Sequence, residues 1–147
     1  MSEKALENRD SLRVDSIMTS EIQCISPAMT VREVINIFGI QSLSSAPIID
    51  NWGKVVGLID ETDLLKLAVS PGLDKHISFC ITKLLTAEKL FTIKRNALFF
   101  EAYNIFLANP IDLLMVVDSN TKLLGTVTQS SILGILCAPG TQDPGGT

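Results

Sequence analysis

The sequence predicts a mixed α/β (α+β) fold made of two copies of one β-α-β-β-α unit. The main observation is an internal repeat, because residues 54–65 (KVVGLIDETDLL) align without a gap on residues 122–133 (KLLGTVTQSSIL), at an offset of 68. The register continues upstream, where residues 36–38 (NIF) align on residues 104–106 (NIF). In addition, 46% of the 147 residues are hydrophobic, which is enough for a core. Since one unit cannot cover both faces of its small sheet, we expect the two units to pack about a pseudo-twofold axis.

The repeated stretch predicts a buried strand that runs directly into a helix. Residues 55–59 are mostly apolar and β-branched, and Gly57 among them indicates a bulge or a close backbone approach. Asp60 lies where a helix N-cap belongs, and Asp63 lies in the first turn. The free N–H groups and positive dipole of a helix start can hold a polar ligand, while a cap without a ligand is the alternative interpretation.

Periodicity and turn residues predict the remaining elements. Thr30 and Glu33 form a capping box, and Val14, Ile17 and Met18 have the spacing to dock a short N-terminal helix. In the first repeat we expect strands at 22–25, 46–49 and 55–59, a turn at 50–53, and helices at 31–38 and 62–69. In the second we expect strands at 90–93, 113–117 and 123–127, and helices at 98–108 and from 132. The chain then divides into a polar segment (1–13), a first repeat (14–72), a linker or helix (73–85), a second repeat (86–138) and a flexible tail (139–147).

Composition argues against several classes of function. The net charge of −4 does not suit a nucleic-acid or anionic-membrane partner. The three cysteines are widely spaced and show neither metal-ligand spacing nor a disulfide framework, so we expect a reducing compartment and no metal site. No signal peptide or spanning apolar run is evident, which makes a cytoplasmic location the expectation. The lone His76 is expected on the surface, and without a recognisable nucleophile–base pair we expect no enzyme.

On these residues the sequence resembles a tandem pair of CBS domains, named from cystathionine β-synthase. The matching pieces of the first repeat are residues 14–18, 30–34, 43–50 and 57–65, and the second repeat matches less closely, with Met115 where the family usually has proline. The resemblance implies a regulatory module that binds AMP, ADP, ATP or S-adenosylmethionine between its repeats and signals to a partner protein. It also implies a homodimer formed through helices. The alternative is an interaction module that has lost its ligand.

The site residues follow from the resemblance. In the family, a hydroxyl residue after the glycine-containing strand is followed three positions later by an aspartate that holds both ribose hydroxyls, and adenine lies against the backbone of the other repeat. In the first repeat, Asp63 matches that aspartate, but Asp60 replaces the hydroxyl residue. In the second repeat, Thr128 matches the hydroxyl residue, but Ser131 replaces the aspartate. The resemblance assigns residues 111–112 to the Asp63 cleft and residues 43–44 to the Thr128 cleft. The candidate ligand-binding residues are Asp63, Thr62, Asp60, Ile111, Asp112, Thr128, Ser130, Ser131, Leu43 and Ser44.

The negative charge of Asp60 predicts an order of affinity among the possible ligands. A phosphate about 4 Å from Asp60 would be repelled by about 1 kcal/mol in water and about 4 kcal/mol at an effective dielectric constant of about 20. We therefore expect one weak site, at Asp63, for adenosine, S-adenosylmethionine or AMP. For ATP without a metal ion, the same repulsion favours the Thr128 cleft. A magnesium ion between Asp60 and the phosphates would remove the repulsion.

Apolar helix positions predict the homodimer surface. Apolar helix residues that a monomer cannot bury usually belong to an interface with another molecule. The residues expected to contribute are Val31, Phe38, Leu64, Leu67, Phe99, Phe106, Leu133 and Leu136.

Overall fold

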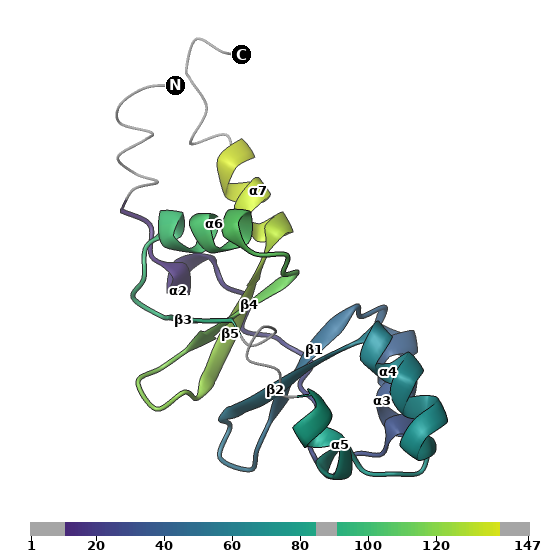
Figure 1. Ribbon diagram of the computed structural model, residues 1–147. Coiled ribbons are helices and arrows are strands. Elements are labelled where there is room, and N and C mark those ends of the chain that lie inside the picture. The colour runs from purple at the N-terminus through teal and green to yellow at the C-terminus, as the bar shows by residue number, and fades with distance from the viewer. Residues whose placement is uncertain (1–10, 85–90, 139–147) are drawn as a thin grey trace. The chain divides into compact units, whose positions relative to one another are not determined.

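A computed structural model describes residues 11–84 and 91–138 (Figure 1). The tail expected at 139–147, most of the polar segment at 1–13, the last residue of the linker and the start of the second repeat (86–90) lie outside the described residues. The elements are α2 (Val14–Ile17), α3 (Val31–Gln41), β1 (Ser45–Ile49), β2 (Val55–Asp60), α4 (Glu61–Leu67), a π-helical turn (Ala68–Gly72), α5 (Ile77–Leu84), β3 (Thr92–Lys94), α6 (Phe99–Ala108), β4 (Leu113–Val117), β5 (Leu123–Thr128) and α7 (Gln129–Cys137).

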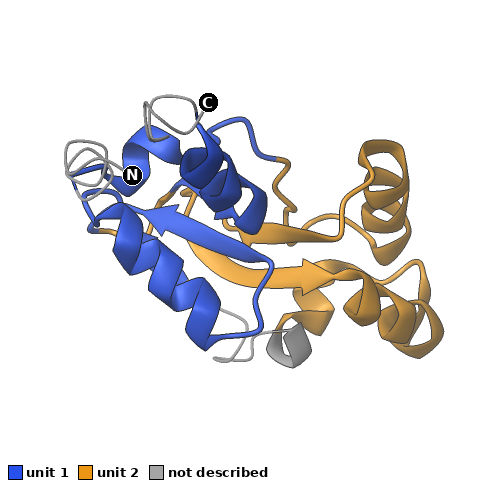
Figure 2. Ribbon diagram, turned by 90° about the horizontal axis from the view of Figure 1, so that it is seen from above, with its two compact units in different colours: residues 1–22, 92–119, 124–147 blue, residues 23–91, 120–123 orange. Residues whose placement is uncertain are grey.

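The chain forms two compact units, shown in different colours in Figure 2. The first-repeat unit takes its described residues from 23–91 and 120–123, and the second-repeat unit takes them from 1–22, 92–119 and 124–147. Each unit contains the strands and two helices of one repeat, α3 and α4 in the first-repeat unit and α6 and α7 in the second-repeat unit. The expected mixed α/β fold with two repeats is therefore confirmed.

The first-repeat unit is built on the antiparallel pair of β1 and β2. Ile48 pairs with Gly57 and Ile49 pairs with Val55, so Val56 is an extra residue, and the irregularity expected beside Gly57 is confirmed. Helices α4 and α5 both contact β2, and α4 also packs on α3. The core is made of apolar residues from these elements: Ile25, Val31, Val34, Phe38, Ala46, Ile48, Ile59, Leu64, Leu67, Ile77 and Cys80.

The second-repeat unit has three strands in the order β3-β4-β5, with β3 and β4 parallel. Helices α6 and α7 contact each other, and their buried side chains Phe99, Ala102, Phe106 and Ile132 join the sheet residues in the core. The β4 strand is buried along four of its five residues, as its unbroken apolar sequence LLMVV indicates.

The offset of 68 is reproduced in the backbone. The parallel bridge between Ile25 and Ile48 in the first-repeat unit corresponds to the parallel pair of Ile93 and Val116 in the second. Only this single bridge forms where a strand was expected at 22–25, and the strand expected at 90–93 lies at Thr92–Lys94. The helix expected at 62–69 begins one residue earlier, at Glu61.

Each unit also includes a segment from outside its own repeat. In the second-repeat unit, the Val14 N–H donates to the Ala97 carbonyl and the Phe99 N–H donates to the Leu12 carbonyl. In the first-repeat unit, the Val31 N–H donates to the Lys75 carbonyl. The segment that precedes one repeat in the sequence thus supports the helix start of the other, and the units do not coincide with the repeats.

The burial of the helices corrects the expected dimer surface. Six of the eight apolar residues assigned to it are buried within the chain itself: Val31, Phe38, Leu64, Leu67, Phe99 and Phe106. They pack inside their own unit, because the apolar face of an amphipathic helix is first covered by the domain that contains it. Leu133 is exposed and Leu136 is half-buried.

The two corresponding helix starts, Thr30 and Leu98, allow a stability prediction. The Thr30 hydroxyl accepts a hydrogen bond from the Glu33 N–H at 3.1 Å, whereas the Leu98 side chain has no oxygen to do so. We expect Thr30→Ala to lower the free energy of unfolding by about 1 kcal/mol and Leu98→Thr to raise it by a similar amount. Urea denaturation of both variants measures this, and equal midpoints for Thr30→Ala and the parent would contradict it.

Candidate functional site

The start of α4 is held by two carboxylates. The Asp63 N–H donates to Asp60 Oδ1 at 2.8 Å, and the Asp60 N–H donates to Asp63 Oδ2 at 3.0 Å. Each aspartate side chain thus accepts from the other's backbone, which is a capping box. The Asp63 side chain is buried, at 8% exposure, and Asp60 is half-buried. The box fixes the orientation of Asp63 and places two negative charges at one helix start.

The start of α7 repeats this geometry without charge. The Ser131 N–H donates to Thr128 Oγ1 at 3.2 Å, the Thr128 N–H donates to Ser131 Oγ at 3.3 Å, and the two hydroxyls lie 3.1 Å apart. The same local structure is therefore built from two carboxylates in one repeat and two hydroxyls in the other. The two positions differ in charge and in acceptor capacity, because a hydroxyl has half the acceptor sites of a carboxylate.

Each helix start lies beside the loop that precedes the hairpin of its own repeat. The Glu61 N–H donates to the Ser44 carbonyl at 3.2 Å, and Gln129 Nε2 donates to the Ile111 carbonyl at 3.3 Å. Sequence reasoning did not single out Glu61 or Gln129. Their equivalence at the offset of 68 is the signal that could have found them.

The remaining candidates are distributed around these two starts. Thr62 and Ser130 are exposed in the first helical turns. In the loops, Ser44 and Asp112 are exposed, Leu43 is half-buried and Ile111 is buried. The structure brings Ser44 to the start of α4 and Ile111 to the start of α7. That each loop also serves the helix start of the other repeat stays a prediction.

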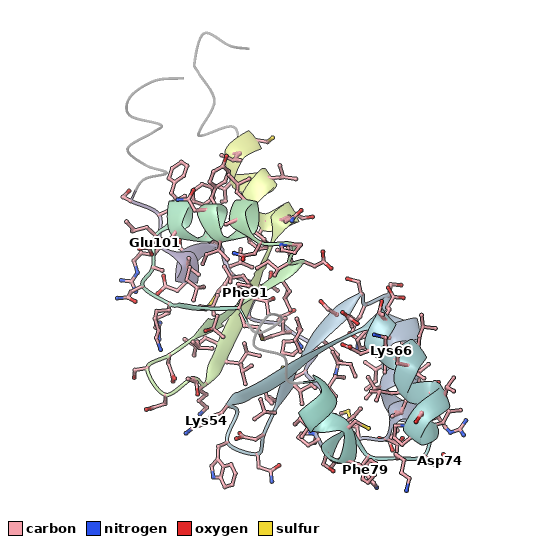
Figure 3. All side chains as sticks on the ribbon, viewed as in Figure 1. Lys54, Lys66, Asp74, Phe79, Phe91 and Glu101 are labelled. Carbon is pink, nitrogen blue, oxygen red and sulfur yellow. The ribbon has the colours of Figure 1, made fainter. Side chains whose placement is uncertain are left out.

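Several basic residues that could offset the charge of Asp60 have other contacts. Arg32 forms an ion pair with Asp74 at 3.2 Å. Lys94 Nζ donates to the Asp118 carbonyl at 3.2 Å. The basic residue on α4 itself is Lys66, which Figure 3 shows on this helix, whereas Lys54 lies at the hairpin. Lys66 is exposed and lies in the last turn, so its charge stabilises the negative end of the helix dipole.

Two other side chains that could react or bind a metal ion are those of His76 and Cys24. His76 is exposed as expected, and its Nδ1 lies 2.7 Å from the Ala28 carbonyl oxygen. Burial raises the pKa of the Cys24 thiol. Within residues 11–84 and 91–138, no group of three or more His, Cys, Asp or Glu side chains could hold a metal ion. In the same part of the chain, none of the helices combines the length and the apolar character needed to cross a membrane.

Comparison with known proteins gives one relative and two solved structures of particular interest. The uncharacterized protein MJ1232 of Methanocaldococcus jannaschii is 29% identical over 126 residues, which are 86% of this chain and 40% of that protein. The chain thus spans two fifths of this relative's length. CBSX2 in complex with AMP has a TM-score of 0.67 at 20% identity, covering 83% of this chain and 93% of that one. The CBS domain pair of protein MJ0100, in complex with 5′-methylthioadenosine and S-adenosyl-L-methionine, has a TM-score of 0.67 at 20% identity, covering 84% and 94%.

The family is settled by the sequence match. The family model of the CBS domain matches this chain twice, at residues 14–70 and 82–138. The two matches fall on the two repeats, and the solved structures share their fold. The chain therefore belongs to the CBS-domain family and contains a tandem CBS pair.

Proposed function

We propose that this chain is a regulatory module in which Asp63 binds the ribose of an adenosine compound. The observation that carries the proposal is the buried Asp63 carboxylate, which the Asp60 N–H holds at the start of α4. A carboxylate accepts several hydrogen bonds at once, so one that caps a helix can also accept from the two hydroxyls of a ribose. AMP in CBSX2, and 5′-methylthioadenosine and S-adenosyl-L-methionine in the MJ0100 pair, give the ligand class its support.

The proposed module signals to a partner protein and acts as a homodimer in the cytoplasm. Ligand binding can alter a partner only if the bound and free states differ in their affinity for it. The negative net charge disfavours nucleic acid and anionic membranes as that partner. We propose no catalytic role and no resident cofactor, so the adenosine compound is an effector.

Ligand charge should control affinity at this site. Asp60 and Asp63 lie together at the start of α4, and each phosphate added to the ligand increases the repulsion. We expect affinity to fall from S-adenosylmethionine through AMP to ATP, by about one to three decades between the extremes. Magnesium should recover most of the ATP affinity, because it binds through a carboxylate and the phosphates and keeps its remaining waters. Calorimetry with and without magnesium measures this, and tighter binding of metal-free ATP than of AMP would contradict it.

The second candidate function is an interaction module without a ligand. The observation that favours it is the incomplete family pattern, with Asp60 in place of a hydroxyl at one helix start and Ser131 in place of an aspartate at the other. A thermal-shift screen with adenosine, AMP, ADP, ATP and S-adenosylmethionine separates the two. A ligand at ten times its Kd adds about 1.4 kcal/mol to the free energy of unfolding, which raises Tm by about 3–6 °C. An unchanged Tm with all five compounds would favour the interaction module.

A further inference from the structure

A polar pocket of about 280 Å³ lies in the first-repeat unit, at the turn that joins β1 to β2. It is lined by this turn, by the loop before α3 and by the start of α5. The polar and aromatic side chains that line it are Ser26, Asp50, Asn51, Trp52 and Ser78. The six residues of β2, about 20 Å of strand, separate the turn from the start of α4. The pocket is therefore distinct from the ribose site proposed at Asp63.

Backbone hydrogen bonds hold the lining segments of this pocket together. The Ile49 N–H, just before the turn, donates to the Ile25 carbonyl at 3.0 Å. The Ser78 N–H at the start of α5 donates to the Pro27 carbonyl at 2.9 Å. The walls of the pocket are thus fixed within one unit before a ligand arrives, which lowers the entropy that binding would cost.

Asp50 is the charged group of the pocket, and the turn itself orients its carboxylate. Its Oδ1 accepts hydrogen bonds from the Trp52 N–H at 2.9 Å and from the Lys54 N–H at 3.0 Å. An ionised carboxylate has about four acceptor positions, so two bonds at one oxygen leave capacity at the other. Among the described residues that line the pocket, none is basic. The pocket therefore suits a ligand that donates hydrogen bonds and carries no negative charge.

Trp52 is the aromatic group of the pocket, and the turn does not need it to form. The second repeat joins its two hairpin strands with the same number of residues. It also places a left-handed residue at the same position, Thr121 with a φ of 64° where the first repeat has Gly53 with a φ of 80°. That turn carries Asn120 in place of the tryptophan. Because the Trp52 side chain is 74% exposed, its flat apolar face is open to a ligand.

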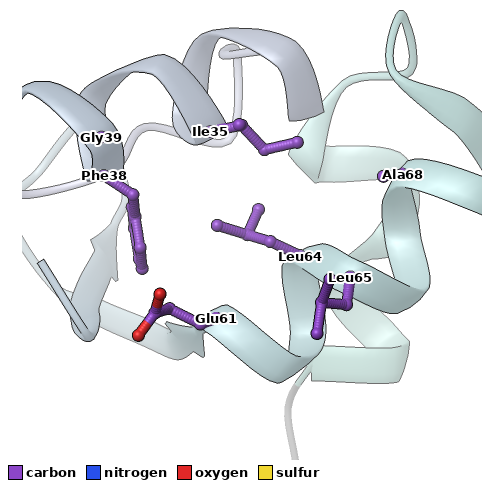
Figure 4. Close-up of a pocket in the computed structure, with 7 residues that line it drawn as sticks. All are labelled: Ile35, Phe38, Gly39, Glu61, Leu64, Leu65 and Ala68. Carbon is purple, nitrogen blue, oxygen red and sulfur yellow. The ribbon is translucent and has the colours of Figure 1, made fainter.

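The pocket differs in chemistry from the larger groove of the same unit, between α3 and α4 (Figure 4). That groove has a volume of about 370 Å³, and Ile35, Phe38, Leu64 and Leu65 are among its lining residues. Apolar side chains of this kind bind apolar groups. The combination of one aromatic face with hydroxyl, amide and carboxylate groups recognises a ligand that has an apolar face and polar edges. A sugar ring has this form, with C–H groups on its face and hydroxyls around its edge.

We propose that the pocket binds a neutral sugar, with the ring stacked on the Trp52 indole and two neighbouring hydroxyls donating to Asp50. The side chains of Ser26, Asn51 and Ser78 can bond the remaining hydroxyls. The volume of about 280 Å³ is just below the range of about 300–1,000 Å³ typical of ligand pockets, which suits a single sugar ring. This site goes beyond the proposed function and does not depend on the adenosine ligand.

The test uses the fluorescence of Trp52, which is the only tryptophan of the 147 residues and so reports on this pocket alone. The full chain is titrated with glucose, galactose, mannose and ribose, and with choline, a cation that an aromatic and a carboxylate can also bind. We expect at least one of the sugars to change the emission saturably with a millimolar Kd, because so small a polar ligand gains little free energy per atom. Absence of saturation with all four sugars, or saturation by choline in their place, would overturn the proposal.

The variant Asp50→Asn separates sugar binding from the structure of the turn. Asparagine keeps an oxygen that can accept from the Trp52 and Lys54 N–H groups, but it loses the charge and the second acceptor oxygen. We expect the variant to stay folded by circular dichroism and to bind the sugar at least about tenfold more weakly. A Kd equal to that of the parent would overturn the assignment of this pocket.

Two further variants locate the sugar. Trp52→Asn introduces the residue of the equivalent turn, and we expect it to lose the calorimetric signal of sugar binding; a retained signal would overturn the stacking on Trp52. Asp63→Ser alters the proposed ribose site, and we expect it to leave the sugar titration unchanged while AMP binding is lost. Loss of the sugar response in Asp63→Ser would place the sugar at the ribose site and overturn the separate pocket. The two sites can thus fail independently.

Discussion

Replacing Asp63 with serine is expected to abolish measurable binding of AMP and S-adenosylmethionine while the chain stays folded. Serine is the residue that the chain itself uses at this position of its second repeat, where Ser131 Oγ accepts the Thr128 N–H. The substitution therefore keeps an acceptor for the Asp60 N–H and removes the charged acceptor proposed for ribose. Losing a charge-assisted hydrogen bond costs about 1.5–3 kcal/mol, which is about one to two decades in affinity. At a weak site this places binding below detection by calorimetry.

The second repeat supplies the matched control. Ser131→Ala removes the equivalent half of the other capping box, so its effect on stability resembles that of Asp63→Ala, but it leaves the proposed ribose site untouched. We expect Asp63→Ala to abolish binding and Ser131→Ala to leave the Kd nearly unchanged. Urea denaturation of both variants shows that each is folded. Equal loss of binding in the two variants, or unchanged binding in Asp63→Ala, would defeat the assignment of the ribose site.

The parts of the site that could be predicted from the sequence are the local ones. A capping box is formed by four consecutive residues, so Asp60 with Asp63 follows from their spacing once the strand before them is recognised. The repeat then implies that Thr128 with Ser131 has the same geometry. The bulge beside Gly57 is equally local, because a glycine inside a strand pattern is itself the sequence signal for such an irregularity.

The parts that could not be predicted depend on what covers each element. Periodicity shows that Phe38 and Phe106 lie on an apolar helix face, but it does not say whether that face meets the chain's own sheet or another molecule. Both proved to be buried in their own units. The packing of residues 12–19 in the second-repeat unit is likewise invisible to a local pattern, since it depends on contacts with residues far along the chain.

Gly125 is where such a long-range contact should have the largest effect on stability. Thr19 and Thr126 exchange two backbone hydrogen bonds of 2.9 Å, which bring the segment after α2 against β5. A Cβ at Gly125 would lie 2.7 Å from Met18 Sδ and 2.8 Å from the Thr19 carbonyl oxygen. The Met18 side chain is flexible, but the Thr19 carbonyl belongs to the backbone, and the Thr19 N–H is hydrogen-bonded to Thr126. Relief of the clash therefore requires the whole segment to move.

We therefore expect Gly125→Ala to lower the free energy of unfolding by about 1–3 kcal/mol, and Tm by about 3–10 °C. Gly134 in α7 is the matched control, because a Cβ there would meet nothing within 4 Å. Gly134→Ala should gain about 0.5–1 kcal/mol, since alanine loses less conformational entropy in a helix. Calorimetric unfolding of both variants measures the difference. An unchanged Tm in Gly125→Ala would show that the segment holding Met18 and Thr19 yields freely, and that its pairing with β5 contributes little to the stability of the second-repeat unit.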